Sequence, residues 1–129
     1  MRILITGARG RLGGKLAAIM AVAHQVIGVD IEDFDLTDFA AVTEAVSAAA
    51  PELIIHCAAM TDVDGCERDQ PGAMSLHAAG VGNLVRTGLR LVTVSTDQVF
   101  DSGSPDPLFE DDPPAGPPVN AYARSKLAG

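Results

Sequence analysis

Tyr122 and Lys126 are the two side chains of this sequence best suited to proton chemistry. Residues i and i+4 of a helix lie on one face, so a helix that begins near Ala121 would place the phenol beside the ammonium. A free phenol holds its proton too tightly for transfer at neutral pH, and a nearby ammonium favours the phenolate. Tyr122, the only tyrosine, is therefore a candidate proton donor, although this spacing alone is common and often has no chemical meaning.

A hydroxyl at Thr96 and a carboxylate at Asp97 follow the apolar run of residues 91–94. If that run is a strand of a parallel sheet, its carboxyl end faces the ligand crevice of the fold. Thr96 and Asp97 are then candidate substrate-binding residues, with Thr96 also a candidate catalytic residue. The alternative is that Thr96 only caps a turn.

A glycine-rich turn lies between the apolar run of residues 3–5 and an amphipathic stretch with helical spacing. Its three glycines are Gly7, Gly10 and Gly13. A strand, a glycine turn and a helix in this order are typical of a dinucleotide site, in which the helix N-terminus faces the pyrophosphate. The spacing Gly-x-x-Gly-x-x-Gly is one residue looser than G-x-G-x-x-G, and a turn that binds nothing is the alternative.

An aspartate, Asp30, ends the second apolar run, residues 25–29. A carboxylate at this place can accept hydrogen bonds from both hydroxyls of an adenosine ribose and disfavours a 2′-phosphate, which favours NAD over NADP. Arg9 and Arg11 lie close enough in sequence to tolerate NADP. The alternative is that Asp30 is an ordinary acid at the end of a strand.

Strand and helix patterns alternate along the chain. Strands are predicted over residues 2–6, 25–29, 53–56 and 91–94, and helices over 10–22, 38–49, 71–87 and from 121 onward. Alternation of this kind indicates an α/β fold, a three-layer Rossmann-like domain with a parallel sheet. We predict the strand order 3-2-1-4 and one NAD(P)-binding domain over residues 1–129. Residues 60–70 and 101–120 are predicted as loops.

Composition excludes several classes of protein. The net charge of −8 at pH 7 argues against nucleic acid as a partner, because phosphate binding needs a basic face. Cys57 and Cys66 lack zinc spacing, no metal site is predicted, and Cys57 is expected in the core. No apolar run is long enough to span a membrane, and a strand pattern rather than a signal peptide comes first, which predicts a cytoplasmic protein. The acidic residues of the 101–120 loop form either a solvated face or a lid.

Four segments together resemble the extended short-chain dehydrogenase/reductase family. They are the glycine turn of residues 7–13, Cys-Ala-Ala-Met-Thr-Asp-Val-Asp at 57–64, Ser-Thr-Asp-Gln-Val-Phe-Asp at 95–101 and Asn-Ala-Tyr-Ala-Arg-Ser-Lys-Leu-Ala-Gly at 120–129. Within that family the pattern is most similar to the N-terminal part of the reductases that act on dTDP-4-keto sugars. The resemblance covers the whole chain, but only the cofactor-binding part of such an enzyme.

The resemblance implies a role for each matching residue. A sugar-nucleotide substrate would bond to Thr96 through its carbonyl and receive a proton from Tyr122 as hydride arrives from the nicotinamide. Lys126 would bond the nicotinamide ribose and stabilise the phenolate. The remaining cofactor contacts implied by the resemblance are the pyrophosphate at Gly10, Arg11 and Leu12, the adenosine ribose at Asp30, the adenine at Asp35 and Leu36, and the nicotinamide side at Ala59, Met60 and Thr61.

The sequence also departs from that family. His56 and His77 stand where such reductases usually have Asn, and we interpret both as packing or surface residues rather than acid–base groups. The segment between His77 and Ser95 is about one helical turn short. The later strands and the sugar-nucleotide domain are absent, so we expect these residues alone to be inactive and the edge of the fourth strand to be open to pairing with a second copy.

Two other functions stay open at this point. The chain could be a non-catalytic NAD(P)-binding or regulatory module, since the resemblance extends to a regulatory subunit of methionine adenosyltransferase. It could also be a remnant that folds without a role. The presence of Thr96, Tyr122 and Lys126 together favours the reductase, whereas the missing domain favours the module.

Overall fold

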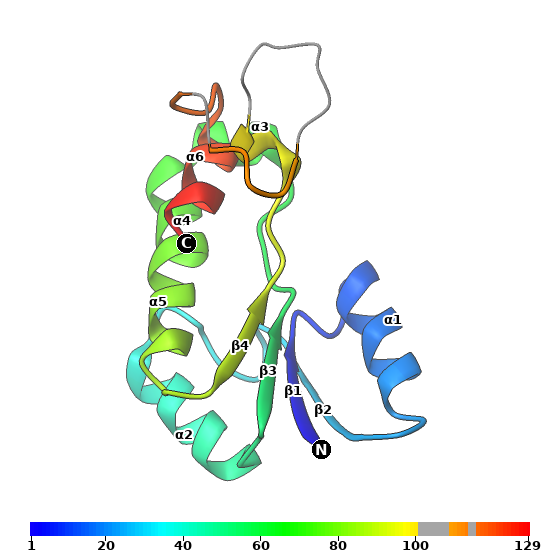
Figure 1. Cartoon of the computed structure of the whole chain (residues 1–129). Helices are drawn as coiled ribbons and strands as arrows, with labels where there is room; N and C mark the ends of the chain where they lie inside the picture. The colour runs from blue at the N-terminus through cyan, green and yellow to red at the C-terminus, as the bar shows by residue number, and fades with distance from the viewer. Residues whose placement is uncertain (101–108, 114–115) are drawn as a thin grey trace.

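Four parallel strands form the centre of the computed structural model, which describes residues 1–100, 109–113 and 116–129 (Figure 1). The strands are β1 (Arg2–Thr6), β2 (Gln25–Val29), β3 (Leu53–His56) and β4 (Arg90–Thr93). Their predicted positions are confirmed within one residue. The three layers and the parallel sheet of the predicted α/β fold are confirmed as well.

The predicted strand order, 3-2-1-4, is wrong, because the sheet has the order β2-β1-β3-β4. β1 pairs with β2 on one side and with β3 on the other, so that Leu4 lies opposite both Ile27 and Ile54. The chain leaves β1 toward β2, then crosses back over β1 to form β3 on its far side. β1 stays inside the sheet, and the point where the chain reverses direction still lies at its carboxyl end.

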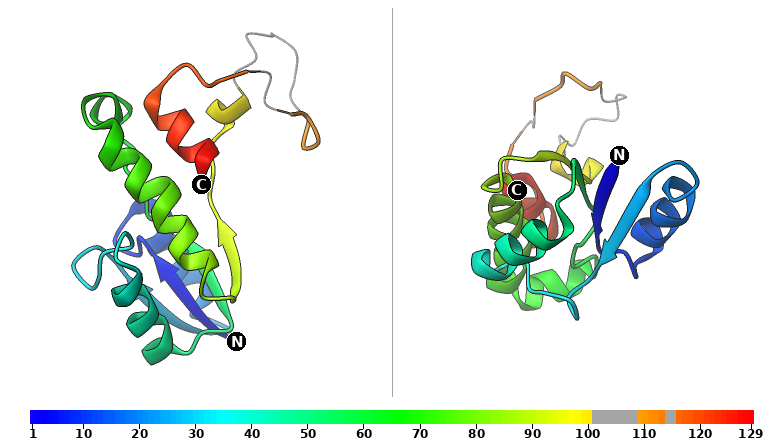
Figure 2. Two further views of the ribbon diagram at one scale, coloured as in Figure 1. Left: turned by 90° about the vertical axis from the view of Figure 1, so that its left-hand side faces the viewer. Right: turned by 90° about the horizontal axis from the view of Figure 1, so that it is seen from below.

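Helices cover both faces of the sheet, as Figure 2 shows with α1 on one side and α2 and α5 on the other. The helices are α1 (Arg11–Met20), α2 (Phe39–Ala49), α3 (Val63–Arg68), α4 (Gln70–Met74), α5 (Gly80–Val85) and α6 (Ala121–Ala128). The described residues also form two short helices of other types, the π-helix η1 (Ser75–Ala79) and the 3₁₀-helix η2 (Asp97–Phe100).

Alternation along β1 divides the core into two parts, because successive side chains of a strand point to opposite faces. Leu4 packs with Val42 of α2 and Leu84 of α5 on one face. Ile3 and Ile5 lie on the other face, where α1 covers them. Successive residues in the middle of β1, Ile3 to Ile5, are therefore all apolar and buried, as expected for a sheet that is covered on both sides.

The start of α2 follows the prediction closely. The carboxylate of Asp38 accepts hydrogen bonds from the N–H groups of Ala40 and Ala41, and so caps the helix. At the other end Ala50 adopts a left-handed conformation with φ of 42°, and the buried Pro51 follows. The N–H of Ala50 still donates to the carbonyl of Val46 at 2.8 Å, but its left-handed conformation turns the chain away, so the helix ends there.

Two predicted elements differ from the structure. Residues 60–70, predicted as a loop, contain α3, which begins after Asp62 and carries Asp64 in its first turn and Arg68 in its last. These charges suit the helix dipole. The predicted helix 71–87 is instead three consecutive pieces, α4, η1 and α5, in which the middle turn is wider than an α turn. α1 and the chain's last helix are confirmed, the former two residues shorter than predicted at its C-terminal end.

The predicted acidic loop lies partly outside the described residues, since 101–108 and 114–115 are not among them. In the described part, the N–H of Phe109 donates to Asp112 at 2.7 Å. Across the described residues, every helix is too short or too polar to cross a membrane.

Two glycines provide a test of this fold. Gly7 has φ of +69°, and an added Cβ would lie 2.6 Å from the backbone nitrogen of Ala58. We predict that Gly7→Ala lowers the free energy of unfolding by more than about 2 kcal/mol, because strain and backbone overlap add together. Gly82, in α5, has open space around it, so Gly82→Ala should raise that free energy by about 0.5–1 kcal/mol through helix propensity. Urea denaturation measures both, and equal effects would contradict the packing described for Gly7.

Candidate functional site

A cleft of about 940 Å³ opens at the carboxyl ends of the strands. At one end lie the glycine turn and Asp30, and at the other lie Tyr122 and Lys126 of α6. Its volume is within the usual range for sites that bind small molecules. Segments far apart in the sequence thus meet around one elongated space.

The glycine turn brings the N-terminus of α1 against the end of β1. The N–H of Gly10 donates to the carbonyl of Gly7 at 3.0 Å, and a Cβ on Gly13 would overlap that same carbonyl. Gly10 is the N-cap residue and offers no capping side chain to the first N–H groups of α1. These N–H groups and the helix dipole suit an anion such as a pyrophosphate. The predicted residues Arg11 and Leu12 line the cleft beside them.

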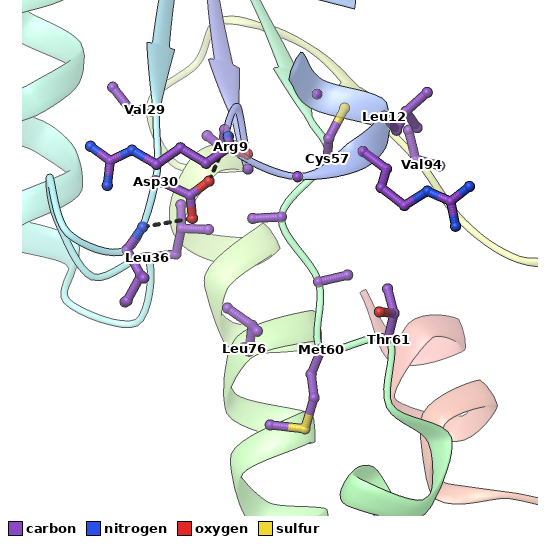
Figure 3. Close-up of a pocket in the computed structure, with 18 of the residues that line it drawn as sticks. Arg9, Leu12, Val29, Asp30, Leu36, Cys57, Met60, Thr61, Leu76 and Val94 are labelled. Carbon is purple, nitrogen blue, oxygen red and sulfur yellow. Dashed lines mark hydrogen bonds between the residues drawn. The ribbon is translucent and has the colours of Figure 1, made fainter. Parts of the chain in front are cut away.

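Asp30 lies at the same end of the cleft, within a hydrogen-bonded loop (Figure 3). Its carboxylate accepts from the N–H groups of Arg9 and Ile31, both at 2.9 Å. The guanidinium of Arg9 forms an ion pair with Glu32 at 2.5 Å and approaches Asp33 at 3.6 Å. The sequence indicated Arg9 as a neighbour of the site, but not that two acids bind its guanidinium.

Lys126 is buried at the opposite end of the cleft. Its Nζ donates to the carbonyl oxygen of Val94, just beyond β4, at 2.6 Å. Burial lowers the pKa of Lys126 from its ordinary value. The ring of Tyr122, one turn earlier in α6, packs edge-to-face on the imidazole of His77, with ring centres 5.7 Å apart. Ala59, Met60 and Thr61 line the same cleft as Tyr122 and Lys126.

Polar side chains from other segments hold α6 in this place. The N–H of Ala121 donates to Glu67 of α3 at 2.6 Å, and the N–H of Ala123 donates to the carbonyl oxygen of the Asn120 side chain at 2.7 Å. The side-chain amide of Asn120 also donates to Gln98 of η2 at 2.9 Å. Sequence analysis assigned no role to Glu67 or Asn120, although Asn120 is a common N-cap residue and directly precedes the predicted helix.

Three predicted site residues do not line the cleft: Asp35, Thr96 and Asp97. The carboxylate of Asp35 accepts from the N–H and the hydroxyl of Thr37, and these hydrogen bonds lower the pKa of Asp35. The hydroxyl of Thr96 donates to Asp97 at 3.2 Å and accepts from the N–H of Gln98 at 3.3 Å. Thr96 thus has the turn-capping arrangement that was its alternative interpretation. The other twelve predicted residues do line the cleft: Gly7, Gly10, Arg11, Leu12, Gly13, Asp30, Leu36, Ala59, Met60, Thr61, Tyr122 and Lys126.

Several residues of the cleft were missed from the sequence. They are mainly apolar or small. Val29 is the last residue of β2, Leu76 lies in η1, and the others follow strand ends: Ile31, Phe34, Ala58, Val94 and Ser95. Cys57 was predicted in the core, but its side chain is only half-buried and lines the cleft, because β3 ends one residue earlier. Burial raises the pKa of the Cys57 thiol. Except for Leu76, the position of these residues at or after the end of a strand is the signal that could have identified them.

Two histidines lie behind the cleft, each only 1% exposed. Nδ1 of His56 is 2.7 Å from the hydroxyl of Thr6, and Nδ1 of His77 is 2.7 Å from the hydroxyl of Ser125. Burial lowers the pKa of His56 to about 4 and that of His77 to about 4, with a smaller effect of the nearby charge of Lys126. Both are neutral at pH 7, so the interpretation of these residues as packing groups fits their burial.

The sheet order, the glycine turn and the cleft at the strand ends define a Rossmann-like fold of the kind found in nucleotide-dependent reductases. The chain belongs to the RmlD substrate binding domain family, whose profile matches residues 1–129. It is 39% identical over 133 residues to a dTDP-4-dehydrorhamnose reductase of Burkholderia thailandensis. That alignment covers 100% of this chain and 44% of the relative. The predicted likeness to the N-terminal part of such a reductase is confirmed.

Solved structures agree with this assignment. A dTDP-4-dehydrorhamnose reductase of Clostridium acetobutylicum is 37% identical, with a TM-score of 0.91, over 99% of this chain and 47% of the other. The enzyme of Bacillus anthracis, solved in complex with NADP, is 36% identical, with a TM-score of 0.90, over 98% of this chain and 46% of the other. The chain therefore spans about half the length of the relatives that it matches.

The buried histidines predict a pH dependence of stability. The unfolded chain takes up protons at His56 and His77 near pH 6.5, whereas the folded chain does so only near pH 4. Stability is therefore complete above pH 6.5 and is lost as the pH falls toward 4, by up to roughly 1.4 kcal/mol per pH unit for each histidine. Urea denaturation between about pH 7 and 5 measures this slope. His56→Asn should reduce this slope, and an unchanged free energy of unfolding across this range would contradict the prediction.

Proposed function

We propose that residues 1–129 form the nicotinamide-dinucleotide-binding part of a dTDP-4-dehydrorhamnose reductase. The observation that carries the proposal is one continuous cleft that joins the glycine turn and Asp30 to Tyr122 and Lys126. The family assignment and the NADP complex of the Bacillus anthracis relative support it. The activity of the whole enzyme, reduction of a 4-keto sugar on a nucleotide, is part of this proposal.

The residues at the glycine turn fit a dinucleotide. The backbone of Gly7 passes so close to Ala58 that a Cβ would fill the space between them, and Gly13 allows the same closeness between α1 and the turn. The N–H groups at the start of α1, with Arg11 and Leu12 beside them, would hold the pyrophosphate. Leu36 would contact the adenine, and Asp30 would accept from the ribose hydroxyls, since a carboxylate keeps free lone pairs after the bonds from Arg9 and Ile31.

The residues of α6 supply the proton chemistry in this proposal. A bound reduced nicotinamide supplies the hydride. Tyr122 would give a proton to the carbonyl oxygen of the sugar, and the ammonium of Lys126 would stabilise the phenolate that remains. Lys126 is already oriented by its bond to the carbonyl of Val94. For Thr96 to bond the sugar carbonyl, its hydroxyl would have to leave Asp97.

A non-catalytic dinucleotide-binding module is the second candidate. The observation in its favour is the position of Thr96 and Asp97 outside the cleft, in a turn that satisfies the Thr96 hydroxyl. Such a module would share the cofactor affinity of the reductase and would not depend on the phenol of Tyr122. Binding alone therefore does not separate the two candidates, and turnover does.

Cofactor binding tests the proposal directly. Titration of the chain with NADH and NADPH up to millimolar concentration, followed by calorimetry or nicotinamide fluorescence, should show binding of both with NADH at least as tight. NAD is favoured because Asp30 disfavours a 2′-phosphate and because Glu32 and Asp33 already engage the guanidinium of Arg9. We predict that Asp30→Asn improves NADPH relative to NADH several-fold, while Arg9→Ala weakens NADPH more than NADH. No binding of either would refute the proposal, and NADPH tighter by tenfold would refute the role of Asp30.

Turnover tests the assignment of the proton donor. We predict that these 129 residues alone do not oxidise NADH with a dTDP-4-keto sugar at an enzyme-like rate. Proton transfer contributes about 10²- to 10⁴-fold, whereas orientation of the two reactants contributes about 7–11 kcal/mol and would depend on parts of the relatives beyond the matched half. In a longer protein that contains this segment, Tyr122→Phe should abolish most turnover and change the dinucleotide Kd less than threefold. Rapid turnover by the 129 residues, or full activity of Tyr122→Phe, would contradict this prediction.

A further inference from the structure

The imidazole of His77 connects two segments of the cleft wall and belongs to neither. His77 lies in the middle of the π-helix η1 and is 1% exposed. Its Nε2 is 2.9 Å from the backbone nitrogen of Met60, in the loop after β3. Its Nδ1 is 2.7 Å from the hydroxyl of Ser125 in α6. The loop of residues 57–61 and the helix that carries Tyr122 are therefore linked through one side chain.

The hydrogen bonds of this side chain determine where its proton lies. A backbone N–H can only donate, so Nε2 must accept from Met60 and cannot carry a proton. The neutral imidazole then has its proton on Nδ1, which donates to the Ser125 hydroxyl. The hydroxyl in turn donates to the carbonyl oxygen of Tyr122 at 2.8 Å. Each donor in the series thus has an acceptor, and the order runs from Met60 to Tyr122.

Protonation of Nε2 would break the hydrogen bond from Met60, because two N–H groups would then face each other in a buried place. Several titratable groups lie around His77, and among them Lys126 disfavours that state through its positive charge. They are Lys126 and Tyr122 on α6, His56 at the end of β3 and the Cys66 thiol of α3, which donates to the carbonyl of Met60 at 3.5 Å. Burial and the Lys126 charge keep His77 neutral.

We propose that His77 is a positioning residue, which in its Nδ1–H form fixes the Met60 loop against α6 and so sets the nicotinamide end of the cleft. This inference rests on the proposed function, since the nicotinamide end has a meaning only if the cleft binds a dinucleotide. His77 does not touch the reacting groups itself. It acts through Met60, which lines the cleft, and through the backbone and ring of Tyr122.

Two substitutions separate the contacts of the imidazole. The amide of Gln reaches as far as Nε2 and can still accept from the N–H of Met60. The amide of Asn ends at the position of Nδ1, so it keeps a polar contact with Ser125 and loses the one to Met60. His77→Leu removes both, and Ser125→Ala removes only the hydroxyl that leads to Tyr122.

Nuclear magnetic resonance of the unsubstituted chain tests the proton position without any variant. Two-bond ¹H–¹⁵N correlations at pH 7 should show His77 with a proton on Nδ1 and none on Nε2. Hydrogen exchange of the Met60 amide should be slow in the unsubstituted chain and in His77→Gln, and at least tenfold faster in His77→Asn and His77→Leu. A proton on Nε2, or equal protection of Met60 in all variants, would overturn the positioning role.

Ligand binding then tests whether the link through His77 sets the nicotinamide end of the cleft. The Kd for NADH should rise about tenfold in His77→Asn and His77→Leu and less than threefold in His77→Gln. The Kd for ADP, which lacks the nicotinamide and its ribose, should be the same in every variant. Equal losses for ADP and NADH would indicate general unfolding and overturn the proposal. Failure of the unsubstituted chain to bind ADP or NADH would overturn the proposed function, whereas NADH binding by a chain with a proton on Nε2 would overturn the role of His77 alone.

Discussion

Contact of backbone on backbone at the glycine turn is the constraint on which the other features of the site depend. Gly7 lies against the backbone of Ala58, and Gly13 lies against the carbonyl of Gly7. Only residues without a Cβ allow β1, α1 and the segment after β3 to approach so closely. The same approach directs the N-terminus of α1 toward the cleft and places residues 58–61 opposite the turn. If this contact were lost, the two ends of the cleft would no longer share one space.

Hydrogen bonds, together with apolar packing of Ala121 against Ala73 and Cys66, fix the other end of the cleft. α6 has eight residues, a length at which an isolated helix is unstable in water. It is held by Glu67, by Asn120, and by Lys126 through the carbonyl of Val94. A buried ammonium bonded to a single carbonyl is costly unless the surrounding groups keep it in place. The position of α6 therefore depends on its contacts with α3 and with the residue that follows β4, rather than on the stability of the helix alone.

The amino-acid pattern alone predicts the strands and the glycine-turn end of the cleft because both depend on local features. Apolar runs, the three glycines and the acid at Asp30 are all contiguous with the strand ends they serve. The strand order was predicted wrongly because local pattern does not say on which side of β1 the chain returns. Both directions are compatible with a right-handed crossover, and only the packing of Leu4 against α2 and α5 distinguishes them. The hydrogen bonds of the Thr96 hydroxyl could not be predicted for a similar reason, since a hydroxyl can satisfy its own turn as readily as it can bind a ligand.

The π turn of η1 has a consequence for how this chain can vary. A π turn contains one residue more than an α turn, so the helices before and after it are rotated relative to an unbroken α-helix by about 100°. This rotation lets Ala73 of α4 pack against α6 while Leu84 of α5 packs against the sheet. Deletion of one residue between Ser75 and Ala79 would restore regular helical geometry and improve local hydrogen bonding. It would also turn one of the two apolar surfaces toward solvent. A deletion that makes the helix itself more stable would therefore make the whole fold less stable.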